Sequence, residues 1–226
     1  MTNTESRTDE AETAVGRVLH DPVSRRKFMA LTGGTASLSV LVAACGDDDD
    51  DDTGTTEAAA SDDALAQFGE GDLGIVNYAL TLEYLEAAFY DQVAKSGLFK
   101  GADLALIQEI GKNEQEHVVA LTSTAKVLGG EPAPQPETQF ETSDAAAVLQ
   151  TAADVENLGA AAYLGQAASI QDPVVLTAAL SIHSVEARHA AALNTLTDQV
   201  ITPDGAFAKP ADAQTVLDAV QPFIVS

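Results

Sequence analysis

Apolar side chains recur every three or four residues from about residue 72 onward, which is the spacing of one face of an α-helix. Capping residues, glycines and prolines divide this pattern into segments. Asp103 and Asp172–Pro173 are expected helix starts, and Gly97 and Gly129–Gly130 are expected stops. We therefore predict four long helices and a shorter fifth, at Asp72–Ser96, Asp103–Leu128, Ser143–Ile170, Pro173–Gln199 and Ala211–Val220.

The connections predict how these helices pair. The links between the first and second helices and between the third and fourth are short, so each pair forms an antiparallel hairpin. Residues 131–142 contain Pro132, Pro134 and Pro136 and cannot be helical. About a dozen extended residues reach ~40 Å, which matches the ~38 Å length of a 25-residue helix. We predict an all-α fold: an antiparallel four-helix bundle with one long crossover between helices 2 and 3.

Two of the predicted helices carry the same carboxylate-imidazole pair on their apolar stripe. E-x-x-H occurs at Glu114–His117 and again at Glu186–His189. Residues three apart share one face of a helix, so each copy directs a carboxylate and an imidazole toward one place. Both stripes continue through apolar residues, namely Ile107, Ile110, Leu121 and Leu128 on one helix and Ala179, Ile182, Leu193 and Leu196 on the other.

The other two long helices each carry a lone carboxylate followed seven residues later by a tyrosine. These pairs are Glu83 with Tyr90 and Glu156 with Tyr163. The second pair of helices thus repeats the first at an offset of 72 to 73 residues. All four glutamates fall near the middle of their helices, and antiparallel packing brings helix middles together.

Four buried carboxylates without partners would each cost several kcal/mol, and two divalent ions would balance their charge. Paired E-x-x-H motifs with two lone glutamates are the ligand pattern of four-helix carboxylate proteins with two metal ions. The alternatives are a glutamate at the core rim that reaches water, or a metal-free bundle. We predict a site for two iron or manganese ions, with the ligands Glu83, Glu114, His117, Glu156, Glu186 and His189.

Glu86 is a second carboxylate on the first helix. The third helix has Gly159 at the equivalent position, so the repeat gives Glu86 no counterpart. Glu86 could therefore replace or supplement Glu83 as a ligand.

Three further residues lie close enough along the helices to contact the ligands. His183 is one turn before Glu186 and could hydrogen-bond a ligand or lie at the polar rim. Tyr90 and Tyr163 could hydrogen-bond ligands across the site or fill the core.

The charge of the chain narrows the range of partners. The 226 residues carry a net charge of −24, which argues against nucleic acid and against electrostatic attraction to anionic lipid. Small cations are the natural complement. The composition is 46% hydrophobic but only 5% aromatic, which favours helices over sheets.

The segment before the helices resembles an export signal. Arg25–Arg26 followed by Phe28 and a mildly apolar run resembles a twin-arginine signal, and Leu41–Cys45 resembles a bacterial lipoprotein cleavage box. These features predict cleavage after Ala44 and a lipid on Cys45, which make the protein an exported cell-envelope lipoprotein anchored outside the cytoplasm. The alternative is a chance arginine pair beside an uncleaved apolar anchor.

The chain then divides into four parts. Residues 1–44 are the export signal, and residues 45–69 are a flexible spacer that contains six consecutive aspartates, Asp47–Asp52. Residues 70–200 form the bundle, and residues 201–226 form a C-terminal extension with the short helix.

The motifs between Leu82–Glu86 and Glu186–His189 resemble the exported ferritin-like domain family that includes desiccation-related proteins. The resemblance covers residues 70–200 and implies a ferritin-like bundle. In the wider superfamily the matching positions bind two irons or two manganeses. The resemblance implies that Glu114 and Glu186 bridge the metals, with terminal ligands at Glu83, His117, Glu156 and His189.

The resemblance leaves two classes of function. One is an oxidoreductase whose metal pair reacts with oxygen or peroxide, as ferroxidases, peroxidases and manganese catalases do. The alternative is a non-catalytic surface lipoprotein that sequesters metal or protects the envelope under desiccation stress. Fold alone does not choose between them, and the sequence leaves the oligomeric state open. Iron storage in a closed shell fits poorly with a lipid tether.

Overall fold

The computed structural model describes residues 64–225. The predicted export signal, Cys45 and the aspartate run lie outside the described residues. The described chain contains five α-helices: α4 (Gly71–Lys95), α5 (Gly101–Val127), α6 (Ala145–Gln166), α7 (Pro173–Leu196) and α8 (Ala213–Val220). Two 3₁₀ turns, η2 (Ala66–Phe68) and η3 (Gln221–Phe223), and two short strands, β1 (Glu137–Thr138) and β2 (Ile224–Val225), complete it. Within residues 64–225 no helix combines the length and apolarity that a bilayer crossing requires.

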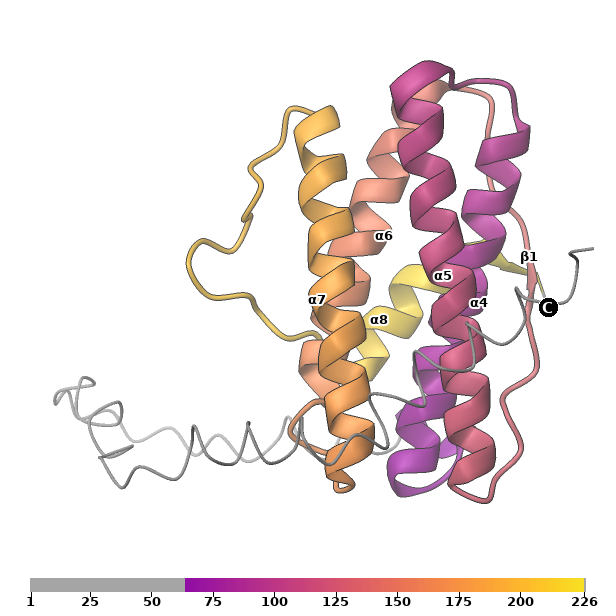
Figure 1. The fold of residues 1–226 in the computed structure, drawn as a ribbon, viewed down its shortest axis with the longest axis vertical. Coiled ribbons are helices and arrows are strands. Elements are labelled where there is room, and N and C mark those ends of the chain that lie inside the picture. The colour runs from indigo at the N-terminus through magenta and orange to yellow at the C-terminus, as the bar shows by residue number, and fades with distance from the viewer. Residues whose placement is uncertain (1–63, 226) are drawn as a thin grey trace, which may run out of the picture. The chain divides into compact units, whose positions relative to one another are not determined.

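The four long helices form the predicted bundle. α4 packs along α5 and α6 packs along α7, and the two hairpins meet through α4 with α6 and α5 with α7 (Figure 1). The short helix α8 packs against α6. The expected all-α bundle of two antiparallel hairpins is confirmed.

A long crossover, residues 128–144, joins the two hairpins along the outside of α4 (Figure 1). Near the start of α4, the Asn77 amide donates a hydrogen bond of 3.2 Å to the Glu131 carbonyl. Near the end of α4, the Gln92 amide donates a bond of 2.9 Å to the Phe140 carbonyl. The two anchor positions are about 22 Å apart along the helix, so the crossover spans most of the bundle as predicted.

The C-terminal segment packs against this crossover. β2 pairs antiparallel with β1, and Phe140 of the crossover packs between Phe89 of α4 and Phe223, with ring centroids 5.2 and 5.5 Å apart. The sequence did not predict these strands, because two residues are too few to show an alternating pattern.

Side-chain caps define two of the helix starts. The Asp172 carboxylate accepts a hydrogen bond of 2.7 Å from the Val174 amide, which confirms the predicted start of α7. Asp144, one residue after the predicted start, caps α6 by accepting from the Ala147 amide at 2.8 Å. The prediction that Asp103 caps the second helix was wrong. Asp103 lies inside the first turn of α5. Its negative charge interacts favourably with the positive end of the helix dipole there, without a capping hydrogen bond.

Two helices end earlier than predicted. α6 ends at Gln166 rather than Ile170, and Ile170 folds back into the core. α7 ends at Leu196 rather than Gln199, because Asp198 takes a left-handed backbone conformation with φ 57°. Leu196, predicted on the inward stripe, is 40% exposed at this frayed end.

The bundle also begins earlier than predicted. Ala64 and Leu65 are buried, and Phe68 of η2 packs edge-on against Tyr78 of α4 at 5.8 Å. The spacer predicted for residues 45–69 is therefore too long at its C-terminal end, since these apolar side chains belong to the core.

Candidate metal centre

Four glutamates meet at the middle of the bundle, one from each long helix. Glu83, Glu114, Glu156 and Glu186 each lie within two residues of the middle of their helix. All four are fully buried, with 0% of their surface exposed. The antiparallel packing thus brings together the carboxylates that the sequence placed at matching heights.

Two histidines complete this cluster and divide it into two overlapping groups. In each group the possible ligand atoms lie within 4.8 Å of one another. Both groups contain Glu114 and Glu186, so these two carboxylates occupy the shared positions. One group adds Glu83 and His117, and the other adds Glu156 and His189.

The first histidine faces three carboxylates with a single nitrogen. His117 Nδ1 lies 2.9 Å from a Glu114 oxygen and 3.2 Å from oxygens of Glu83 and Glu186. One Nδ1 hydrogen cannot satisfy three oxygens. Adjacent ligands of a six-coordinate ion with bonds of about 2.1 Å lie about 3.0 Å apart, so this spacing suits atoms that share one ion.

The second histidine is held on its outer side as well. His189 Nδ1 lies 3.0 Å from Glu114 and 3.2 Å from Glu156. Its Nε2 lies 3.0 Å from the side-chain amide of Asn113 on α5. When Nδ1 faces a metal, Nε2 carries a hydrogen, and the Asn113 amide, turned so that its oxygen faces the ring, would accept it and fix the ring orientation. Asn113 could not be predicted from the sequence, because the contact joins residues 76 positions apart.

Two tyrosines connect the hairpins at the centre. Tyr90 on α4 donates a hydrogen bond of 2.5 Å to Glu156 on α6, and Tyr163 on α6 donates one of 2.5 Å to Glu83 on α4. The two bonds are related by the internal repeat. Of the two interpretations offered by the sequence, the structure shows hydrogen bonding across the site.

Glu86 lies beside the cluster rather than in place of Glu83. It is buried but belongs to neither four-residue group. A β-carbon at Gly159 would lie 3.0 Å from Glu86 Oε1 and 3.2 Å from Glu186 Oε2. Gly159 therefore provides the room for this fifth carboxylate, which explains a glycine in the middle of a helix despite its cost of about 1 kcal/mol.

His183 points elsewhere. Its Nδ1 lies 3.0 Å from the Ala160 carbonyl of α6, to which an Nδ1 hydrogen would donate. The structure therefore gives His183 a backbone partner between α6 and α7, and none of the six predicted ligands.

Burial favours the protonated form of four of the five carboxylates in the metal-free centre. It raises the pKa of Glu83 and Glu86 well above the ordinary value, and nearby carboxylates raise both further. It also raises the pKa of Glu156, and that of Glu186 to about 8. Glu114 is the exception, because its polar contacts with the two histidines and with Glu83 outweigh its burial and lower its pKa to about 2.

Both histidines carry a positive charge in the metal-free cluster. Burial lowers their pKa, but hydrogen bonds and charges from the glutamates outweigh it. The pKa of His117 is raised to about 12 and that of His189 to about 10. Metal ions would have to displace these protons, because an imidazole binds metal in its neutral form.

Hydrogen bonds within the protein do not satisfy all the carboxylate oxygens at the centre. Among the described residues, Glu114 Oε1 and both Glu186 oxygens are buried and accept no hydrogen bond. Although His189 Nδ1 lies 3.0 Å from a Glu114 oxygen, that contact lacks hydrogen-bond geometry. These oxygens belong to the two shared carboxylates, where a bridging cation would replace the missing donors. The residues present therefore fit a pair of metal ions.

A comparison with known families agrees with the four-helix fold. Residues 71–199 match the sequence model of the family described as ferritin-like domain. The match spans α4 to α7 and includes all six candidate ligands. No curated protein matches the chain. Since the match covers more than half of its length, the chain belongs to the ferritin-like domain family.

Proposed function

We propose that the protein holds two iron or manganese ions and reacts with oxygen or peroxide, as a ferroxidase, peroxidase or catalase-like oxidoreductase. The supporting observation is the set of buried, unsatisfied oxygens on Glu114 and Glu186. Two divalent ions would bring four positive charges to four fully buried carboxylates. Carboxylate and imidazole ligands suit iron and manganese, and such ions supply one-electron chemistry toward oxygen species when bound.

Different residues would hold each of the two ions. Glu83 with His117 would hold one ion, Glu156 with His189 would hold the other, and Glu114 and Glu186 would contact both. Tyr90 and Tyr163 fix the two outer carboxylates by hydrogen bonds.

Metal stoichiometry tests the site. Protein loaded anaerobically with Fe(II) or Mn(II) and freed of excess metal should retain two ions per chain. Glu186→Gln should lose at least one ion, because the amide keeps the shape of the side chain without its charge. Glu109→Gln removes the same charge from the exposed face of α5 and should retain both. Equal metal content in both variants, or no retained metal in the wild type, would reject the site.

Reactivity separates the two classes of function. The iron-loaded or manganese-loaded protein is mixed with dissolved oxygen or hydrogen peroxide, and metal oxidation and peroxide loss are followed. A reaction that depends on Glu186 supports the oxidoreductase. Tight binding of two ions that react with neither oxidant would refute it and favour metal sequestration.

We also propose that the bundle is exported and anchored by a lipid on Cys45. The supporting observation is the order of parts, with Arg25–Arg26 followed by an apolar run, the Leu41–Cys45 box and an acidic spacer. The diacyl group of a bacterial lipoprotein meets the two-chain requirement for stable anchoring. Cys45→Ser should release the protein from membranes or block its processing. A variant that stays with the membrane fraction at the mass of the wild type would contradict lipidation.

A further inference from the structure

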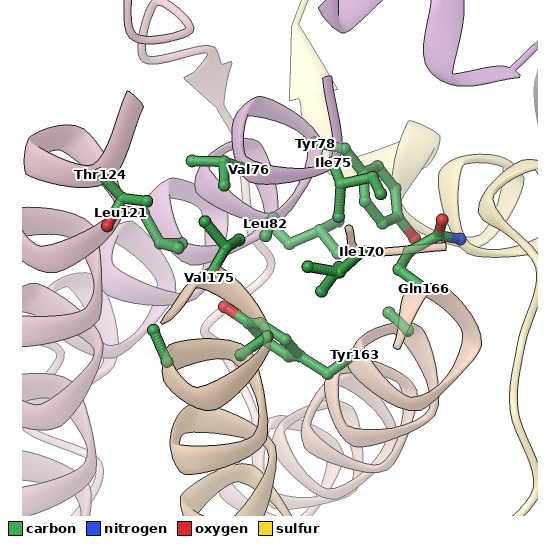
Figure 2. Close-up of a pocket in the computed structure, with 14 residues that line it drawn as sticks. Ile75, Val76, Tyr78, Leu82, Leu121, Thr124, Tyr163, Gln166, Ile170 and Val175 are labelled. Atoms are coloured by element: carbon green, nitrogen blue, oxygen red, sulfur yellow. The ribbon is translucent and has the colours of Figure 1, made fainter. Parts of the chain in front are cut away.

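A small apolar pocket lies at the end of the bundle formed by the start of α4 and the end of α5, close to the metal centre (Figure 2). Ala79 lines it from one turn before Glu83, and Leu121 lines it from one turn after His117. Four residues rise about 6 Å along a helix axis, so the pocket and the candidate ligands are neighbours.

Tyr163 forms the wall between the pocket and the centre. Its ring lines the pocket, as Figure 2 shows, while its hydroxyl donates to Glu83 at 2.5 Å. A molecule in the pocket would thus be separated from a ligand carboxylate by one side chain.

The outer end of the pocket reaches the surface. Thr124 of α5 and Ala178 of α7 both line it and are half-buried, whereas most of the lining is buried. The lining therefore comes nearest to solvent at these two residues, on α5 and α7.

The lining suits an apolar guest rather than water. Ile75, Leu82, Ile170 and Val175 surround the space in Figure 2, and the Thr124 hydroxyl is already bonded to a backbone carbonyl of its own helix. The hydroxyl of Tyr78, 1% exposed, has no hydrogen-bond partner among the described residues. Gln166 also contributes to the lining beside Tyr78, but the surface facing the space is almost wholly apolar, whereas a buried water needs two to four polar partners.

The size of the pocket limits the guest further. The space holds about one or two molecules of the size of water and is too small for an aromatic ring. Dioxygen is apolar and diatomic and fits both limits. Hydrogen peroxide is as small, but it would lose its hydrogen bonds to water on entering, and each unpaired polar group costs about 1–3 kcal/mol.

We infer that this pocket is a holding site for dioxygen, through which the oxidant reaches the metal centre. The inference rests on the proposed function, since it names the oxidant of that centre. With two ferrous ions bound at the centre, each would supply one electron, so that dioxygen with two protons from solvent would leave as hydrogen peroxide and the two ions would become ferric.

Dioxygen itself is the first probe, because it is paramagnetic and speeds the relaxation of nearby methyl groups. Metal-free full-length protein, labelled at isoleucine methyls, is measured with and without dissolved oxygen. Ile75 of the pocket and Ile182 outside it are both 7% exposed and form a matched pair. The enhancement should be several-fold larger at Ile75 and Ile170 than at Ile182. Equal enhancement would overturn the inference, and metal binding plays no part in this result.

The second test fills the pocket with a larger side chain. Ala79 and Ala152 occupy equivalent positions in the internal repeat and are 7% and 2% exposed, but only Ala79 lines this pocket. Ala79→Val should abolish the extra relaxation and slow oxidation of bound Fe(II) by dioxygen several-fold, with unchanged iron content and an unchanged rate with hydrogen peroxide. Ala152→Val should change neither rate.

The outcomes separate the two proposals. Equal slowing with both oxidants, or no slowing with dioxygen in Ala79→Val, overturns the pocket as the route. Failure of the wild type to retain iron overturns the proposed function, and the relaxation of Ile75 still decides whether dioxygen enters the pocket.

Discussion

Removal of the metal ions should make the bundle less stable as the pH rises. In the metal-free protein the pKa of Glu186 is about 8, because burial and the charges of Glu156 and Glu114 outweigh the influence of the nearby His117. In the unfolded chain its ordinary value of 4.5 applies. Between these values the folded protein keeps a proton that the unfolded chain has lost, so a rising pH favours unfolding.

The size of this effect follows from the number of retained protons. Each one lowers the free energy of unfolding by about 1.4 kcal/mol per pH unit. Glu186 alone therefore accounts for about 3 kcal/mol between about pH 6 and pH 8, a large part of the roughly 5–15 kcal/mol of a typical domain. Glu83 and Glu86, whose pKa values are also raised, act in the same direction.

The two histidines also make the metal-free protein less stable as the pH rises, and Glu114 does not oppose this trend. The stabilisation from charged His117 and His189 is complete below the ordinary pKa of 6.5 and is lost as the pH rises toward about 12 and about 10. Glu114, with its pKa lowered to about 2, stabilises the fold above its ordinary 4.5, and that contribution is lost only as the pH falls toward 2.

Urea unfolding at several pH values between about 6 and 8, followed by circular dichroism, measures the slope directly. Saturation with Mn(II) should remove most of it, because the ion stabilises the deprotonated ligands. Glu186→Gln should reduce the metal-free slope by about one proton, or 1.4 kcal/mol per pH unit, whereas the exposed Glu109→Gln should not. Metal-free protein whose stability is constant or rises over this range would refute the reasoning.

Three further substitutions test individual contacts. Asn113→Leu should weaken binding of one of the two ions about 10- to 100-fold in a metal titration and spare the other, since only one ligand histidine loses its outer partner; equal weakening of both would contradict this. Tyr90→Phe should lower unfolding stability by about 1–3 kcal/mol by leaving a buried carboxylate oxygen without its donor, and the half-buried Tyr84→Phe on the same helix should cost less. Gly159→Ala should cost less stability, by about 0.5–3 kcal/mol, when Glu86→Ala has removed the nearer of the two carboxylates that the added β-carbon meets, so an additive double-mutant cycle would refute the packing account.

The helices and the six candidate ligands could be predicted because the relevant signal is periodic. Spacing of three residues placed Glu114 with His117. The internal repeat favoured Glu83, whose counterpart is Glu156, but left Glu86 open as a replacement or supplement. The structure brings Glu83 into the cluster and leaves Glu86 beside it. Helix periodicity fixes which residues share a face, and equal helix lengths fix which residues share a level.

Single contacts between helices could not be predicted in this way. The bond between Asn113 and His189 depends on the rotation of α5 relative to α7, which the spacing along either helix does not set. His183 is a similar case, because its position one turn from Glu186 allowed either a contact with a ligand or a place at the rim, and its ring faces the Ala160 carbonyl. The apolar pocket is likewise a gap among side chains of four helices, and no single segment carries a signal for it.

The two tyrosine bonds are related by the internal repeat, so the centre resembles the interface between two identical hairpins that are joined in one chain. Two copies of the first hairpin about a two-fold axis would present two sets of Glu83, Glu114, His117 and Tyr90, each tyrosine reaching the glutamate of the other copy. Duplication and fusion of one hairpin produces this arrangement. The pairing of Glu86 with Gly159 marks where the halves stopped being interchangeable, because a symmetric copy would set two carboxylates where one now fits.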